Sequence, residues 1–89
     1  MATVTVPGGW TPTTGGRSTF TYPGDTVGSI LDRLAADYPD LRKRIFSGQQ
    51  IAGWINVYIG DDDVRWAGGL SAAIGPEVDL VILPALAGG

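Results

Sequence analysis

The sequence contains no cysteine and no histidine among its 89 residues, and these two absences exclude several kinds of chemistry. Without cysteine there is no disulfide, no thiolate metal site and no cysteine nucleophile. Without histidine the chain lacks the commonest general base and a frequent metal ligand. We therefore expect that the chain is not an enzyme by itself and that it holds no metal.

Basic residues and long apolar runs are also scarce. Six Lys and Arg against nine Asp and Glu give a net charge of −3, which argues against a nucleic-acid partner. The one basic cluster, residues 42–44, is expected on a solvated helix face. The sequence contains no run of eighteen apolar residues, so no membrane span is predicted. No signal peptide is visible at its start. We expect a cytoplasmic protein without a membrane partner.

The length predicts a single domain over residues 1–89, with room for one core. Residues 3–6 and 17–22 alternate between apolar and polar side chains as half-buried strands do, with Val4 and Val6 facing inward. Residues 7–16 are rich in turn-forming Gly, Pro and Thr. These segments predict an N-terminal β-hairpin with a long connection, in which Trp10 folds back on the edge of the core.

The period of the apolar residues then changes from two to that of a helix. One face of the predicted helix carries Val27, Ile30, Leu31, Leu34, Ala35 and Tyr38. Asp25 or Thr26 supplies the N-cap, and Pro39 ends the helix. Residues 41–46 are expected to add a short helical turn with Leu41 and Ile45 inward.

A second strand region follows at residues 53–59, the candidate for the central strand. Its alternation places Ile55, Val57 and Ile59 toward the helix and Trp54, Asn56 and Tyr58 on the other face. Residues 60–63 predict an acidic turn that leads into a short strand over 64–66. The turn lacks the spacing, central Gly and distal Glu of an EF-hand, so a calcium site is not predicted. Residues 68–74 predict one helical turn that packs Leu70 and Ile74 into the core.

The last stretch reads as a strand, a proline stop and a tail that ends in two glycines. Residues 78–83 are β-branched and aliphatic, and Pro84 has no N–H for a strand ladder, so pairing is expected to stop there. Residues 84–89 then form a flexible tail, of which the five residues after Pro84 reach roughly 17 Å. Two glycines have no side chains, so they can pass through a narrow channel into the active site of another protein. A frayed terminus without a function can also end in two glycines.

The order of elements predicts an α+β fold of the β-grasp, ubiquitin-like type. One main helix crosses one face of a mixed sheet of four to five strands. The covered face takes Val4, Val6, Ile55, Val57, Ile59, Leu80 and Ile82. The other face carries Trp54, Tyr58, Val81 and Leu83. Exposed apolar side chains of this kind indicate a surface that binds a partner, a surface for self-association, or ordinary strand residues that are partly exposed to solvent.

At this point the sequence resembles a known family. Residues 61–66, Gly69-Leu70 and the ending at 81–89 are similar to the MoaD/ThiS-type ubiquitin-like sulfur carriers. The likeness is greatest to the actinobacterial cysteine-biosynthesis carriers, the CysO type, and residues 14–16 and 24–27 also fit. It covers essentially the whole chain.

The resemblance implies that an E1-like (MoeB/ThiF-type) enzyme adenylates Gly89 with ATP and that a thiocarboxylate is then formed there. The sulfur passes to an accepting synthase, of which a cysteine-synthase-like enzyme is the CysO-type example. A metalloprotease that trims the C-terminus is a further implied partner, and no cofactor is bound by the chain itself.

The cost of ordering the tail predicts which residues dock on the partner. Fixing five residues costs roughly 5–10 kcal/mol, and glycines offer little area to offset it. We therefore expect a partner-binding patch to supply the binding energy while the tail enters the partner's active site. The patch comprises Trp54, Tyr58, Val81, Leu83 and Pro84, and the tail Leu86, Ala87, Gly88 and Gly89.

Three alternatives stay open. A carrier of the same fold would deliver sulfur to thiazole, molybdopterin, a thiosugar or a thiolated tRNA base rather than to cysteine. A ubiquitin-like modifier would instead be joined through Gly89 to lysines, with Lys43 as the only lysine of this chain. A plain β-grasp interaction module would carry the diglycine incidentally.

Overall fold

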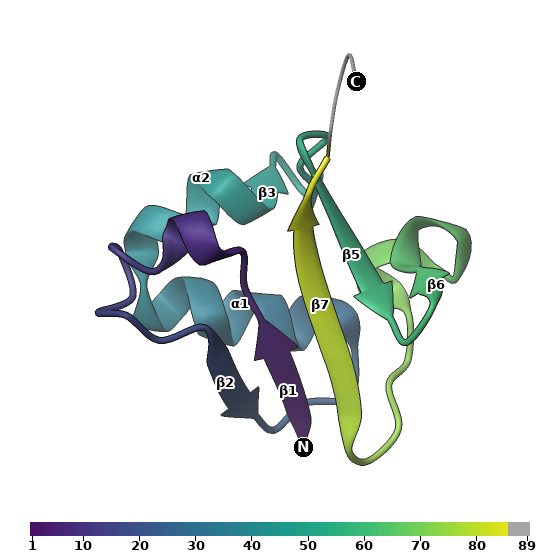
Figure 1. Ribbon diagram of the computed structural model, residues 1–89. Helices are drawn as coiled ribbons and strands as arrows, with labels where there is room; N and C mark the ends of the chain where they lie inside the picture. Colours follow the sequence, from purple (N-terminus) through teal and green to yellow (C-terminus); the bar gives the residue numbers. More distant parts are fainter. Residues whose placement is uncertain (86–89) are drawn as a thin grey trace.

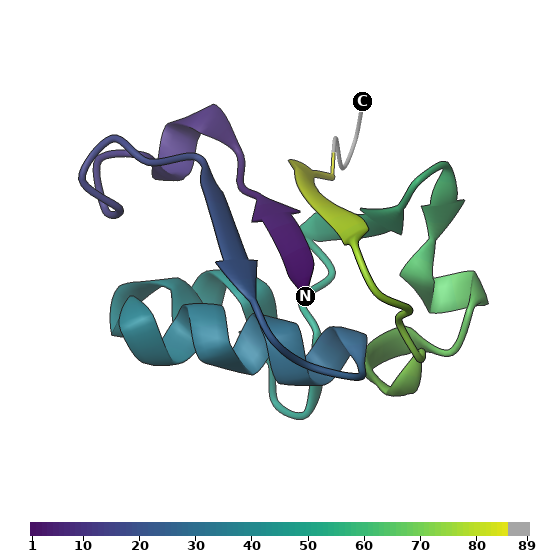
Figure 2. The same cartoon turned by 90° about the horizontal axis from the view of Figure 1, so that it is seen from below.

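A computed structural model describes residues 1–85, and the predicted tail residues 86–89 lie outside the described part of the chain. The strands of the main sheet stand in the order β2-β1-β7-β5-β6, with helix α1 across one face (Figures 1 and 2). The bounds are β1 (Ala2–Thr5), β2 (Thr19–Tyr22), α1 (Val27–Asp37), β5 (Ile55–Ile59), β6 (Asp62–Asp63) and β7 (Val78–Pro84). The predicted β-grasp fold is confirmed.

Strand β7 occupies the middle of this sheet. It pairs in parallel with β1 and antiparallel with β5, while β1 pairs antiparallel with β2 as the predicted hairpin. Strand β5 has only the two-residue β6 on its other side. The prediction that residues 53–59 form the central strand was therefore wrong, because the C-terminal strand is the one that joins the two halves of the sheet.

Helix α1 begins at a complete capping box. Of the two predicted N-caps Thr26 is the one used: its Oγ1 accepts from the Ser29 N–H at 3.1 Å, and the Ser29 Oγ accepts from the Thr26 N–H at 3.2 Å. The face of α1 toward the sheet is buried as predicted, with Val27, Ile30, Leu31, Leu34 and Ala35. Figure 2 shows the helix lying as one layer against the strands.

Replacing Thr26 by Ala is expected to lower the free energy of unfolding by about 1 kcal/mol, because one N–H of the first turn loses its acceptor. Urea denaturation followed by circular dichroism measures the change. Thr26→Ser, which keeps the accepting hydroxyl, is the control and should stay close to the original protein. Equal losses in both variants would contradict a role for the hydrogen bond.

The core lies between α1 and the sheet, and its sheet side largely matches the prediction. Val4, Val57, Leu80 and Ile82 are fully buried, and Val6 and Ile55 nearly so. Ile59 is only half-buried and sits at the end of β5, next to the exposed Gly60 turn. It nevertheless packs against the core, on the covered face where it was predicted.

The predicted turn after α1 is present as η2 (Pro39–Leu41) and α2 (Arg42–Ile45), with Leu41 and Ile45 completely buried. Residues 42–44 are exposed, as expected. A two-stranded sheet of β3 (Phe46–Ser47) and β4 (Gln50–Ile51) follows, which the sequence did not predict. No helix within residues 1–85 is both long and apolar enough to cross a bilayer.

The segment after β5 differs from the prediction. Val64–Trp66 is a 3-10 helix, η3, rather than a strand, and the short strand is the preceding β6. Asp63 explains this, because its Oδ1 accepts from the Arg65 N–H at 2.9 Å and caps the turn. A second 3-10 helix, η4 (Gly69–Ser71), leaves Leu70 and Ile74 half-buried against the core, while the neighbouring Ala72 is buried.

The regular strand ends at Pro84, as predicted, although one further backbone hydrogen bond follows it. Pro84 lies opposite Ile55, and the Ala85 N–H beyond it donates to the Trp54 carbonyl at 2.9 Å. Because hydrogen-bonded and non-hydrogen-bonded pairs alternate between antiparallel strands, Pro84 and Ile55 form a non-hydrogen-bonded pair. The Ile55 N–H therefore does not bind Pro84 and donates instead to the Ala52 carbonyl at 3.3 Å. A missing N–H at Pro84 therefore costs the β5–β7 ladder nothing.

Candidate functional site

The face of the sheet opposite α1 is uncovered by any other part of the described chain (Figures 1 and 2). On this open face Tyr58 of β5 lies directly opposite Val81 of β7, and Asn56 lies opposite Leu83. Alternation along the strands places Asp79 on the same face, together with Thr3, Thr5, Thr19 and Thr21 of the hairpin. The β5–β7 half therefore carries the large apolar side chains of this face beside Asn56 and Asp79, and the hairpin half carries only threonines.

Three of the predicted patch residues are brought together here, and we call Tyr58, Val81 and Leu83 the apolar patch. Tyr58 and Val81 are half-buried, and 46% of Leu83 is exposed, which is high for a leucine in the middle strand of a sheet. Pro84 is exposed at the end of β7, next to Leu83. The patch thus lies along the last residues of β7 that lead toward the C-terminal segment.

Trp54, also predicted for the patch, is held by different contacts. Its indole Nε1 donates to the Arg44 carbonyl of α2 at 3.0 Å, which ties the ring to the end of that helix. The side chain is still 53% exposed, so it remains available to a partner. Its backbone carbonyl is the acceptor for the Ala85 N–H described above. Trp54 is therefore joined to the exit of β7 by its backbone.

The sequence analysis did not predict that Trp66 is exposed on the surface. It is 88% exposed, and with Tyr58 and the acidic residues 61–63 it lines a shallow hollow beside β6. The sequence interpretation placed it in a strand, and a strand tryptophan is normally half-covered by its neighbours. The 3-10 turn η3 instead presents its ring to solvent.

The titratable groups of the described residues do not assemble a reactive centre at the open face. Within residues 1–85 no three Asp or Glu side chains are placed to share a metal ion. Burial, helped by a hydrogen bond to Asp37 Oδ2 at 2.8 Å and by that carboxylate's charge, raises the pKa of Tyr22 above its ordinary value. This pair joins β2 to α1, so its role is structural. The open face is suited to binding.

The residues predicted to react lie outside the part of the chain that the structure describes. Leu86, Ala87, Gly88 and Gly89 follow Ala85 in the sequence, and no geometry is assigned to them. The apolar patch and the final pairing of Ala85 are thus the described features nearest to them along the chain.

Comparison with known proteins gives consistent relatives. No protein-family model matches the chain. The sulfur carrier protein CysO of Mycobacterium tuberculosis is 38% identical over 90 residues, which covers 98% of this chain and 97% of the relative. CysO of Mycobacterium bovis matches with the same identity and coverage.

Solved structures agree with the sequence relatives. A chain of the Amycolatopsis orientalis BexX/CysO complex superposes with a TM-score of 0.90 at 36% identity, with full coverage of both chains. Mycobacterium tuberculosis CysO gives a TM-score of 0.88 at 35% identity, covering 97% of this chain and 100% of that one. The small archaeal modifier protein 1 of Methanosarcina acetivorans, at 24% identity and a TM-score of 0.84, shares the fold.

Proposed function

This chain belongs to the CysO family of sulfur carrier proteins, and from that premise we propose that it carries sulfur on the carboxyl group of Gly89. The observation that supports the proposal most is the likeness to CysO, which covers 98% of this chain. A carrier of the CysO type donates sulfur for cysteine biosynthesis and is not itself a catalyst. The loading enzyme and the sulfur acceptor are therefore separate proteins.

Loading needs an activated carboxylate, because a free carboxylate is a poor electrophile. In the proposed sequence an E1-like enzyme transfers AMP from ATP to the Gly89 carboxylate and releases pyrophosphate. A sulfide donor then attacks the carbonyl carbon, AMP leaves, and a thiocarboxylate remains. The acceptor, a cysteine-synthase-like enzyme working on an activated serine, takes that sulfur as a nucleophile. ATP is consumed by the activating enzyme, so the carrier needs no cofactor.

The apolar patch is the proposed dock for these enzymes. Its three side chains lie together on an uncovered face, next to Pro84 and Ala85, which precede Gly89 by only a few residues in the sequence. An enzyme that covers the patch would receive the tail in a fixed direction. Burial of apolar area at about 25 cal/mol per Å² supplies binding energy that the glycines lack.

The intact mass of the protein tests the proposal. The natural protein is first weighed to establish that its last residue is Gly89, and is then incubated with ATP, an E1-like enzyme and sulfide. We expect the mass to rise by the difference between one sulfur and one oxygen. Covalent adducts with other proteins would instead indicate a modifier, and no change would indicate a plain interaction module.

Replacing Leu83 by Asp is expected to raise the KM of the activating enzyme for this chain by about ten- to a hundredfold. The physical reason is the loss of about 1.5–3 kcal/mol of apolar burial, where 1.4 kcal/mol corresponds to a factor of ten. Steady-state release of pyrophosphate measures the effect. Thr21→Asp, with the same added charge on the polar half of the open face, should change KM less than about threefold. Similar effects of both substitutions would show that the patch is not the dock.

A further inference from the structure

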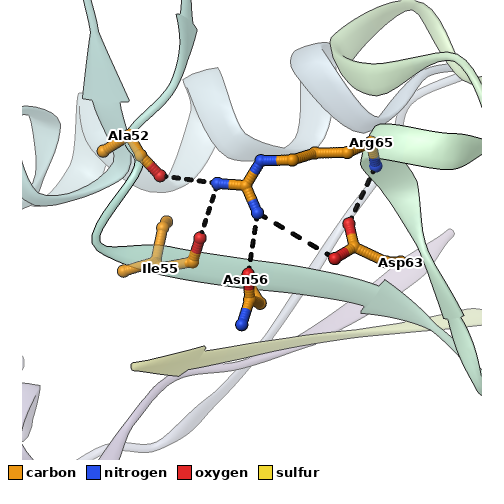
Figure 3. A network of polar contacts seen from close by, with 5 residues as sticks. All are labelled: Ala52, Ile55, Asn56, Asp63 and Arg65. Carbon is orange, nitrogen blue, oxygen red and sulfur yellow. Dashed lines mark hydrogen bonds and ion pairs between the residues drawn. The ribbon is translucent and has the colours of Figure 1, made fainter. Parts of the chain in front are cut away.

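Arg65 makes an unusual number of contacts for a partly exposed side chain (Figure 3). Its NH2 group donates to the Ala52 carbonyl at 2.9 Å and to the Ile55 carbonyl at 2.7 Å. Its NH1 group donates to Asn56 Oδ1 at 2.7 Å and lies 3.9 Å from Asp63 Oδ2. The guanidinium thus joins η3 to both ends of the turn over residues 52–55, at the start of β5.

That turn also holds the end of β7. Strand β1 accompanies β7 only as far as Val81, so the later residues of β7 are paired with β5 alone. Pro84 has no N–H, and the next backbone bond is the one from Ala85 to the Trp54 carbonyl. Trp54 and Gly53 are the two residues that lie between Ala52 and Ile55, whose carbonyls Arg65 binds. The shape of the turn therefore decides whether Ala85 has an acceptor.

The turn is closed by the Ile55 N–H, which donates to the Ala52 carbonyl at 3.3 Å, and two further contacts join it to α2. The Ala52 N–H is bound to the Ile45 carbonyl, and the Trp54 indole is bound to α2, so both fasten the turn toward α2. Arg65 approaches from η3 on the far side of β5 and fastens the turn to the sheet. Arginine suits the position because its planar group carries donors in fixed directions, whereas the ammonium of lysine is a point charge.

We infer that Arg65 is a positioning residue for sulfur loading: it holds the 52–55 turn so that Trp54 fixes Ala85, and thereby sets where the chain leaves the sheet toward Gly89. The link to loading rests on the proposed function. The link from Arg65 to Ala85 does not rest on the proposed function, and it can be measured in this protein without any partner.

The first experiment compares amide hydrogen exchange, by NMR, in the original protein and in Arg65→Gln and Arg65→Lys variants. We expect exchange at Ala85 to become about tenfold faster in Arg65→Gln, because its acceptor loses its support. Exchange at Tyr58 and Val81, which form a hydrogen-bonded pair further along the ladder, should change less than about threefold. Arg65→Lys should resemble Arg65→Gln. Faster exchange by the same factor at all three amides, or no change at Ala85, would overturn the inference.

Arg42→Gln is the matched control. Arg42 is also an arginine with a carboxylate partner, Asp32 at 3.3 Å, but its side chain is 51% exposed and it binds no carbonyl of the turn. Its loss should leave the exchange rate of Ala85 unchanged. An equal acceleration of Ala85 in the Arg42 variant would count against a specific role for Arg65.

The second experiment measures loading by the activating enzyme. Since the apolar patch is intact in Arg65→Gln, KM should stay within about threefold, while kcat falls about tenfold because the carboxylate is presented less often in reactive geometry. An effect on KM alone would overturn the positioning role. If the original protein accepts no sulfur, the proposed function fails, and the exchange rates still decide whether Arg65 fixes Ala85.

Discussion

Deleting Gly89 should abolish the formation of thiocarboxylate and leave the fold unchanged. The variant still ends in a glycine carboxylate, but that carboxylate lies one residue, roughly 3.3–3.6 Å, short of the position that an activating enzyme is built to reach. Misplacement by even about 1 Å can cost a hundredfold in rate, so a gap of this size leaves no measurable loading. All core residues that the structure describes precede Ala85, so the melting temperature should not move.

Intact mass after incubation with ATP, the activating enzyme and sulfide reports the loading, and circular dichroism reports the fold. Ala87→Gly is the control, because it changes a neighbouring residue and keeps the length of the chain. It should load sulfur as the original protein does. Normal loading of the shortened chain would place the reactive carboxylate elsewhere and refute the assignment of Gly89.

Replacing Leu80 by Ala should lower the free energy of unfolding by about 2–5 kcal/mol, because it opens a cavity in the core. Leu80 is completely buried and lies on β7, which joins the two halves of the sheet. Small domains have about 5–15 kcal/mol of stability, so this loss is a large share of the total. Each kcal/mol lowers the melting temperature of a domain of this size by about 4–8 °C. Thermal and urea denaturation measure the change.

Leu83→Ala is the matched control, since it makes the same substitution on the same strand but on the open face. Surface substitutions usually stay within about 0.5 kcal/mol, so its stability should be nearly that of the original protein. It should instead weaken binding to the activating enzyme. If the two variants lost the same stability, the distinction between a covered and an open face of β7 would be incorrect.

Much of the fold could be predicted because its signals are local. The helix period at Val27, Ile30 and Leu34 and the alternation in residues 78–83 each follow from one element packing one face against a core. Short irregular elements were less predictable. The Asp63 cap turned an expected strand into η3, and a side-chain bond to a backbone N–H competes with strand pairing without leaving a periodic signal.

The partner patch could be predicted only in part. Alternation along two strands places Tyr58, Val81 and Leu83 on one face, and the register between β5 and β7 then brings Tyr58 opposite Val81. Alternation over the predicted strand placed Trp54 on the same face, but it does not indicate a hydrogen bond to a distant carbonyl, so the bond from Trp54 to Arg44 was not foreseen. The bonds from Arg65 to the carbonyls of Ala52 and Ile55 were also missed, because they join residues that lie ten or more positions apart.

The sequence by itself determined the single helix, the apolar faces of the strands and the likeness to sulfur carriers, because each depends on the order and type of neighbouring residues. Only the tertiary structure decided that β7 is the central strand, that Pro84 is accommodated in a non-hydrogen-bonded pair, and that Arg65 binds the carbonyls of Ala52 and Ile55. These features depend on which strands become neighbours and in which register. Such long-range pairing is set by the packing of the whole core rather than by any one segment.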